Sequence, residues 1–237
     1  MKKQKKTIIE REGIGITKID KMIQGGLPKG SIIGLSGPPG VGKSIFCLHF
    51  LLEGARKGQK CVYINLEEPE SNINNMISQF EFAEELNQLI KEEKIVIKCL
   101  TYHEYEKIYT DLFEKIREDK KIGRLVIDSF NIFFSSSFNP GSLNLSHEVN
   151  IRRIINQAFS TLRRRELTTI LTLEMQLDRQ PRFYYNLPYL VDGMIDLDYL
   201  ELGTIERRIF ISKMRWTNQF KEGKNFDITK KGIVICE

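Results

Sequence analysis

One eight-residue stretch constrains the fold of this chain more than any other feature. Gly37-Pro-Pro-Gly-Val-Gly-Lys-Ser44 matches the pattern G-x-x-x-x-G-K-S in full, between an apolar stretch, 31–36, and a stretch, 43–55, that is apolar almost all round. Glycines let successive backbone N–H groups turn inward around phosphate oxygens, and a helix start adds partial positive charge at the same place. The stretch therefore predicts a strand, a phosphate-binding loop and a buried helix in that order.

The same motif predicts the ligand, because each of its residue types has a role on a nucleoside triphosphate. Lys43 would reach the β- and γ-phosphates, and the Ser44 hydroxyl would bind Mg²⁺. We therefore expect ATP and Mg²⁺ as the bound groups, with ADP as product. The residues expected to hold the nucleotide are Gly37, Pro38, Pro39, Gly40, Val41, Gly42, Lys43, Ser44 and Ile45.

Composition places the chain among ordinary globular proteins. It has 237 residues, 41% hydrophobic and 28% charged, with a net charge of +5. No apolar run approaches the roughly 18 residues of a membrane span, and the four scattered cysteines include no Cys-x-x-Cys pair. We expect reduced cysteines and a cytoplasmic protein without a membrane partner.

Alternation of apolar strands and amphipathic helices predicts an α/β fold with a mostly parallel central sheet flanked by helices. The expected strands are 31–36, 60–66, 94–99, 124–127 and 168–173, and the expected helices are 43–55, 71–80, one near 105–116 and one over 149–162. The helices stop after about residue 189, so the apolar stretches 193–201, 207–214 and 225–234 predict an antiparallel extension of the sheet. Residues 1–12, with four lysines in the first six, are expected to be a flexible basic tail, and residues 13–237 a single domain.

Three acidic residues follow predicted strands on the phosphate side. Asp128 ends the strand Leu125-Val-Ile127, where a carboxylate can hold Mg²⁺ or its water. Glu67 and Glu68 end the strand 60–66, and either can orient and deprotonate an attacking water. The alternative is structural: Asp128 as a turn residue, and the two glutamates as the first residues of a loop.

Together these pieces resemble the KaiC-type branch of the RecA superfamily of ATPases, over nearly the whole chain. The segment 15–30 is similar to the entry signature of that family, Glu67-Glu68 to its acidic pair, 124–129 to its metal-binding strand, and 190–193 and 213–215 to its late segments. The resemblance implies a RecA-like P-loop fold and a Mg²⁺-dependent ATPase that works as a ring, with a hexamer favoured. It further implies nucleotide at the subunit interfaces and a regulatory or switch role with an unknown protein partner.

Several further roles are implied by the resemblance alone. Lys213 and Arg215 match a Lys-x-Arg pair that reaches the γ-phosphate on the neighbouring subunit, although without the resemblance they would be exposed residues of an edge strand. Glu174 lies where RecA-like proteins place a polar residue that senses the γ-phosphate. Ile228 and Thr229 lie in a late strand that contacts the nucleotide of the neighbour.

Two alternatives remain open at this point. Trp216 and Gln219 stand where relatives have a small residue and a histidine, so a non-hydrolysing scaffold that assembles on ATP is one alternative. The other is a RadA or RecA paralogue that binds single-stranded DNA. The expected loop 135–146 has no Lys or Arg, but the loop 175–187 combines charge with stacking surface. Its candidate contacts are Arg179, Arg182, Phe183, Tyr184 and Tyr185.

Overall fold

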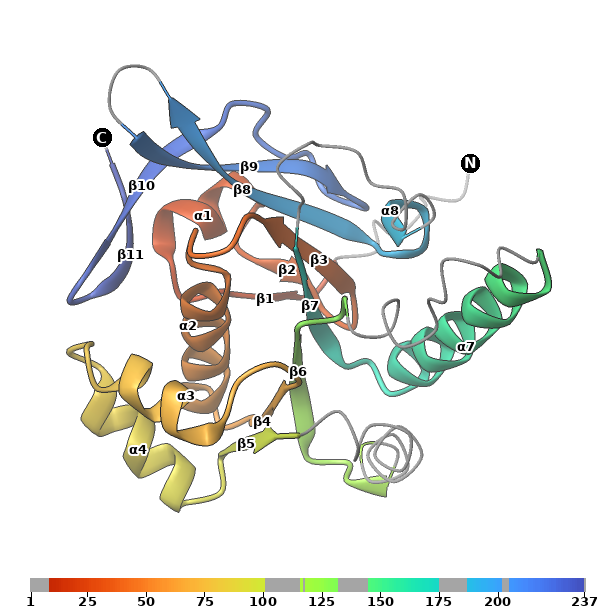
Figure 1. Ribbon diagram of the computed structural model, residues 1–237, viewed down its shortest axis with the longest axis horizontal. Helices are drawn as coiled ribbons and strands as arrows, with labels where there is room; N and C mark the ends of the chain where they lie inside the picture. The colour runs from red at the N-terminus through yellow and green to blue at the C-terminus, as the bar shows by residue number, and fades with distance from the viewer. Residues whose placement is uncertain are drawn as a thin grey trace, which may run out of the picture.

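A nine-stranded sheet with the strand order β11-β10-β9-β8-β3-β7-β6-β4-β5 organises the computed structural model (Figure 1). The structure describes residues 9–100, 116, 118–131, 145–174, 187–201 and 205–236, with 145–154 and 201 described by backbone alone. The strands are β1 (Arg11–Glu12), β2 (Leu27–Pro28), β3 (Ile32–Gly37), β4 (Lys60–Asn65), β5 (Ile95–Cys99), β6 (Ile122–Asp128), β7 (Thr168–Glu174), β8 (Gly193–Glu201), β9 (Ile205–Met214), β10 (Lys224–Thr229) and β11 (Gly232–Ile235). The helices are α1 (Thr17–Met22), α2 (Lys43–Arg56), α3 (Glu70–Ile77), α4 (Ala83–Lys91), α7 (Leu145–Arg164) and α8 (Leu187–Leu190).

The sheet is parallel from β8 through β3, β7, β6 and β4 to β5, and antiparallel from β8 to β11. This arrangement confirms the expected α/β fold with its C-terminal antiparallel extension. All parallel strands end at the same edge, and the loop that follows β3 lies there. In open sheets of this kind, ligands bind at that edge.

The two sheet faces carry separate hydrophobic clusters. Along β3 and β4, odd-numbered residues such as Ile33 and Tyr63 pack in the cluster of α2, and even-numbered ones such as Ile32 and Val62 pack in the cluster of α7. In β6 and β7 the parity is reversed, but the alternation is the same. This alternation follows from the two-residue period of a strand. Figure 1 shows α2, α3 and α4 on one side of the central strands and α7 on the other. The continuous apolar strands of the sequence are thus explained by burial on both faces.

Two expectations about element boundaries need correction, and one helix lies where no element was predicted. Residues 225–234 are not one strand but the hairpin β10–β11, which turns at Lys230 and Lys231, just before Gly232, where φ is +84°. Residues 11–12 do not belong to a tail, because they pair with β2 as β1. The charged region around 83–91 is a helix, α4, which buries Leu86 and Leu89. The helix expected near 105–116 lies outside the described residues, apart from the buried Ile116.

Arg124 anchors the N-terminal segment to the core at Gly13. Its side chain is fully buried, and Nη1 donates to the backbone oxygens of Gly13, at 2.7 Å, and Phe50, at 2.6 Å. Nε donates to Gln59, and the guanidinium lies 4.6 Å from the centre of the Phe50 ring. A buried cation needs such partners, and these link the N-terminal segment, α2 and β6.

No helix in the described part of the chain is both long and apolar enough to cross a membrane.

His49 connects α2 to the terminal hairpin. Its Nε2 atom accepts the N–H of Ile233 at 3.0 Å, and its ring meets the edge of Phe82 at 5.4 Å between centroids. Burial, with a smaller contribution from the charge of Arg56, lowers the pKa of His49 from 6.5 to about 4. The folded protein therefore keeps this imidazole neutral in a pH range where the unfolded chain protonates it.

We expect the free energy of unfolding to fall as the pH decreases from 6.5 to about 4, because the unfolded chain binds one proton more at His49 in that window. The contribution is fully present above pH 6.5 and amounts to about 3 kcal/mol from the difference in pKa. Urea unfolding at a series of pH values measures it. The control is His49→Gln, whose amide oxygen can accept the Ile233 N–H without titrating, so its pH dependence should be flatter. If the free energy of unfolding depends on pH equally in the wild type and in His49→Gln, His49 is not the group responsible.

Candidate functional site

The loop between β3 and α2 forms the floor of the site. Gly40 and Gly42 have φ angles of +74° and +117°, a conformation that favours glycine, and α2 begins directly after them. This geometry turns the loop around the start of α2, where backbone N–H groups lack partners within the helix. The predicted strand, loop and buried helix are all present.

Lys43 lies at the start of α2 with its ammonium folded over the loop. Nζ donates to the backbone oxygens of Gly37, at 2.8 Å, and Pro38, at 3.0 Å. Burial lowers the pKa of Lys43, while the nearby carboxylates of Glu174, Asp128 and Glu67 act in the opposite direction. Lys43 is therefore a cation held beside three acidic groups, in a place where phosphate oxygens could replace the two carbonyls.

Asp128, at the end of β6, accepts hydrogen bonds from three hydroxyl groups. Ser44 donates to Oδ2 at 2.8 Å, Tyr63 to the same oxygen at 2.5 Å, and Thr172 to Oδ1 at 2.5 Å. The side chain is buried, so these bonds compensate for lost hydration of the charge. The pairing of Ser44 with Asp128 brings together the two residues expected to bind the metal.

Glu67 and Glu68, the acidic pair after β4, have different hydrogen-bond partners. Asn65 caps the end of β4, because its Oδ1 accepts the N–H groups of both Glu67 and Glu68 at 2.8 Å each. Ser129 donates a short hydrogen bond to Oε1 of Glu67. Burial raises the pKa of Glu67, the Ser129 hydrogen bond opposes this, and the charges of Glu174 and Asp128 raise it further. Both glutamates are exposed, but only Glu67 is held by a side-chain hydrogen bond in the described structure, so the two are not equivalent.

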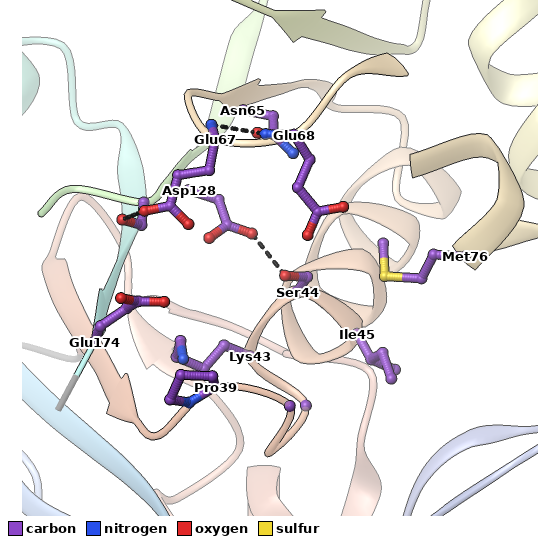
Figure 2. A pocket seen from close by; sticks show the side chains of 13 residues that line it. Pro39, Lys43, Ser44, Ile45, Asn65, Glu67, Glu68, Met76, Asp128 and Glu174 are labelled. Carbon is purple, nitrogen blue, oxygen red and sulfur yellow. Dashed lines mark hydrogen bonds between the residues drawn. The ribbon is translucent and has the colours of Figure 1, made fainter. Parts of the chain in front are cut away.

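These groups surround a cavity of about 280 Å³. Figure 2 shows the side chains of Glu67, Glu68, Asp128 and Glu174 around one space above Lys43 and Ser44. Glu174 is fixed at the end of β7, where its N–H donates to Asn131 at 3.1 Å. The lining residues are Pro39, Gly40, Gly42, Lys43, Ser44, Ile45, Asn65, Glu67, Glu68, Met76, Asp128, Ser129 and Glu174.

A magnesium ion fits this donor set only together with a bound phosphate. Among the described residues, no group of three or more His, Cys, Asp and Glu side chains could hold a metal. Ser44 and Asp128 nevertheless offer two adjacent oxygen donors beside the loop 37–44, whose sequence has the phosphate-binding pattern and which we call the phosphate-type loop. Mg²⁺ ordinarily takes one or two protein oxygens and completes its shell with water and substrate phosphate, so the arrangement fits that ion.

Lys213 and Arg215 lie at the opposite end of the sheet. Met214 pairs with Gly193, which in turn pairs with Ile33 near the start of β3, roughly 13 Å along the strands from the end of β3. Neither residue lines the cavity. Their cations contact the protein instead: Lys213 bonds the carbonyl oxygens of Pro188 and Val191, and Arg215 bonds Asp192. They cannot complete the cavity of their own chain from this position.

Two further candidates lie on β10, close to the chain's own loop. A side chain at Gly42 would meet Ile228 at 3.1 Å, so Ile228 packs directly against the phosphate-type loop. Thr229 takes part in the hairpin turn, where its hydroxyl oxygen accepts the N–H of Lys231 at 3.1 Å. In this single chain both residues therefore have contacts within the subunit.

Sequence reasoning missed Met76, which lines the cavity, and four polar residues that line it or bond to Asp128: Asn65, Tyr63, Thr172 and Ser129. All four lie in or next to the strands that end at the ligand edge. A polar residue in an apolar strand was the available signal, since a buried hydroxyl or amide needs a partner. The DNA candidates Arg179, Arg182, Phe183, Tyr184 and Tyr185 lie outside the described residues, as does most of the stretch 135–146.

Comparison with known proteins gives a consistent picture. The family described as "ATPase: KaiC" matches residues 13–237. A UPF0273 protein of Pyrococcus furiosus is 29% identical over 96% of this chain and 94% of its own length. The circadian clock protein KaiC3 of Synechocystis is 28% identical, but this chain spans only 46% of it. The crystal structure of a KaiC-like protein from Pyrococcus horikoshii superimposes with a TM-score of 0.77 at 29% identity, covering 97% of this chain and 100% of that one.

The Asn65 cap predicts a local loss of stability. Asn65→Ala leaves the N–H groups of Glu67 and Glu68 without their acceptor, so we expect the free energy of unfolding to drop by roughly 1–3 kcal/mol. Urea denaturation measures this. Asn72→Ala, at an exposed position on α3, is the matched control and should change stability by less than about 0.5 kcal/mol. Equal effects at both positions would mean that the cap contributes nothing.

Proposed function

We propose that this chain, which belongs to the KaiC family of ATPases, binds ATP with Mg²⁺ and hydrolyses the bond between the β- and γ-phosphates. The observation that carries the proposal is the position of Glu67. Its carboxylate, which has a raised pKa and is held by Ser129, faces the same cavity as Lys43 and Ser44. Such a group is suited to act as a general base toward a water molecule.

In this proposal each residue of the cavity has a distinct task. Backbone N–H groups of the loop 37–44 bind the phosphates, and Lys43 exchanges its two carbonyl partners for phosphate oxygens. Ser44 and Asp128 hold Mg²⁺, which when bound neutralises charge on the phosphates. Glu67, oriented by Ser129, takes the proton of the attacking water, and Glu174, whose charge acts on Lys43 in the same cavity, would sense the terminal phosphate.

The complete site would require a second copy of the chain. Phosphoryl transfer is promoted by cations that reach the γ-phosphate. Lys213 and Arg215 are suited to this task, but they lie at the far end of the sheet from their own cavity. We therefore propose a cytoplasmic homo-oligomer, a hexameric ring being favoured, in which these residues act on the nucleotide of the adjacent subunit. Hydrolysis would then switch the ring or its contacts with a protein partner.

Glu67→Gln should lower kcat by roughly 10²–10⁴-fold, because the amide cannot accept a proton. The dissociation constant for ATP should change little, since Glu67 does not contact the phosphate loop. Phosphate release at saturating ATP, combined with equilibrium binding of ATP, measures both. Glu68→Gln is the matched control and should retain most of the turnover. A larger loss at Glu68 would transfer the role of base to that residue, whereas binding without turnover in the wild type would identify an ATP-gated scaffold.

Arg215→Ala should lower kcat by roughly 10²–10³-fold without weakening ATP binding in its own cavity. Arg164→Ala, at an exposed position on α7, is the control and should leave kcat unchanged. Mixing Arg215→Ala with Lys43→Ala subunits tests action between subunits. One variant retains an intact cavity and the other an intact Arg215, so the mixture should be more active than either alone. A fully active monomer, or a mixture with no gain, would refute action between subunits.

A further inference from the structure

Three cations converge on the last carbonyl groups of α8. Lys213 donates to the oxygens of Pro188, at 2.6 Å, and Val191, at 2.7 Å. Arg215 donates to Tyr189 at 3.2 Å, and Arg163 to Leu190 at 2.7 Å. Four consecutive carbonyls, those of residues 188–190 in α8 and of Val191 just after it, are thus bound by Arg163 of α7, Lys213 of β9 and Arg215, which follows β9. Figure 1 shows the end of β9 beside α8.

Asp192 is the buried carboxylate that joins two of these cations. Its side chain is 3% exposed, whereas those of Arg163 and Arg215 are 41% and 44% exposed. Arg215 Nη1 lies 3.1 Å from Oδ1, and Arg163 Nη2 lies 3.3 Å from each carboxylate oxygen. Oδ2 also accepts the N–H of Ile32 at 3.1 Å, so the carboxylate is fixed to the first residue of β3.

The backbone reinforces this anchor. The N–H of Arg215 donates to the backbone oxygen of Asp192 at 2.8 Å, and the N–H of Asp192 donates to that of Ile32 at 2.7 Å. Asp192 therefore connects β3, which ends in the phosphate-type loop, to the residue that follows β9. A bond to a buried, immobile carboxylate restricts a long side chain that would otherwise sample many rotamers.

Charge balance gives Asp192 a second effect. Lys213, Arg215 and Arg163 are like charges gathered at one end of α8, and they repel one another. The charges of Arg215 and Arg163 lower the pKa of Lys213, although burial is the larger cause, and the charge of Asp192 acts against this. Without the carboxylate, the three cations would be held only by carbonyl dipoles.

Arg215 can be anchored and still reach a ligand. A guanidinium has five N–H donors, and the described contacts of this one are single bonds from Nη1 and Nη2. Its remaining donors and its partial exposure leave the group able to contact phosphate on another molecule. The contacts of Asp192 are therefore suited to aim Arg215 rather than to consume it.

We propose that Asp192 is a positioning residue for ATP hydrolysis, which holds Arg215 in the orientation needed to act on the nucleotide of the adjacent subunit, with Arg163 sharing the anchor. The inference rests on the proposed function, since it has meaning only if Arg215 acts between subunits. Asp192 touches no reacting atom, and its effect should appear only through Arg215.

The experiment uses the mixed assembly, because it separates the subunit that supplies Arg215 from the subunit whose cavity reacts. In the first mixture, Asp192→Asn is in the subunit that supplies Arg215, so Lys43→Ala/Asp192→Asn is mixed with Arg215→Ala. In the second mixture, it is in the subunit whose cavity reacts, so Arg215→Ala/Asp192→Asn is mixed with Lys43→Ala. We expect kcat of the first mixture to fall roughly tenfold relative to the mixture without Asp192→Asn, which corresponds to a rise of about 1.4 kcal/mol in the activation free energy. We expect kcat of the second mixture to be unchanged. Asp119→Asn, which removes a carboxylate bonded to Lys60, is the control and should have no effect in either position.

Each result has a definite meaning. Asp192→Glu in the first arrangement should recover part of the lost turnover, because the carboxylate is retained. Equal losses in both arrangements would show a merely structural role and overturn the inference, as would unchanged or increased turnover in the first. If Arg215→Ala and Lys43→Ala subunits show no gain on mixing even without Asp192→Asn, the proposed function itself fails and the inference fails with it. Thermal melting of each variant verifies that the compared subunits are folded.

Discussion

The buried carboxylate of Asp128 is the interaction on which the rest of the site depends. A charge in the interior must be compensated, and here three hydroxyl groups from α2, β4 and β7 do so. Those bonds hold the start of α2, and with it the phosphate-type loop, at a fixed position over the sheet. The same requirement explains why Tyr63 and Thr172 carry hydroxyl groups at buried positions of β4 and β7. The side chain expected to bind the metal therefore also has a structural role.

The direction of the strands divides the molecule into two functional ends. Parallel strands bring the phosphate-type loop, Asp128, Glu67 and Glu174 to the edge where those strands end. The antiparallel return of β9 carries Lys213 and Arg215 to the opposite edge, beside the first residues of β3. One sheet thus presents acidic and phosphate-binding groups at one end and cations at the other. In the proposed oligomer, the side of one subunit that carries Lys213 and Arg215 would face the side of the next subunit that carries the cavity.

Much of this arrangement could be predicted, and the limits have physical causes. The parallel strands were predicted to within two residues because both of their faces are buried, which makes their sequences continuously apolar. The hairpin 224–235 was read as one strand because its turn is only two residues, Lys230 and Lys231, between apolar stretches. The difference between Glu67 and Glu68 was not predictable, since it depends on Ser129, a residue 62 positions away. The tail predicted over residues 1–12 does not include residues 11–12, because they pair with the two-residue strand β2 and Glu12 lies 3.8 Å from Arg124, which is far away in the sequence. Local composition does not show either contact.

The sequence by itself determined the phosphate-type loop, the order of strands and helices and the acidic residues at the strand ends, because each depends on local spacing and composition. Only the tertiary structure decided which side chains meet. Asn65 caps two N–H groups, Glu67 and not Glu68 is held by a hydroxyl, and Asp192 joins Arg163 to Arg215. The Asn65 contacts are local, but those of Glu67 and Asp192 join residues far apart in the chain, and the register of the sheet brings them within hydrogen-bonding distance. Register follows from the packing of both faces at once, which no single segment of the sequence encodes.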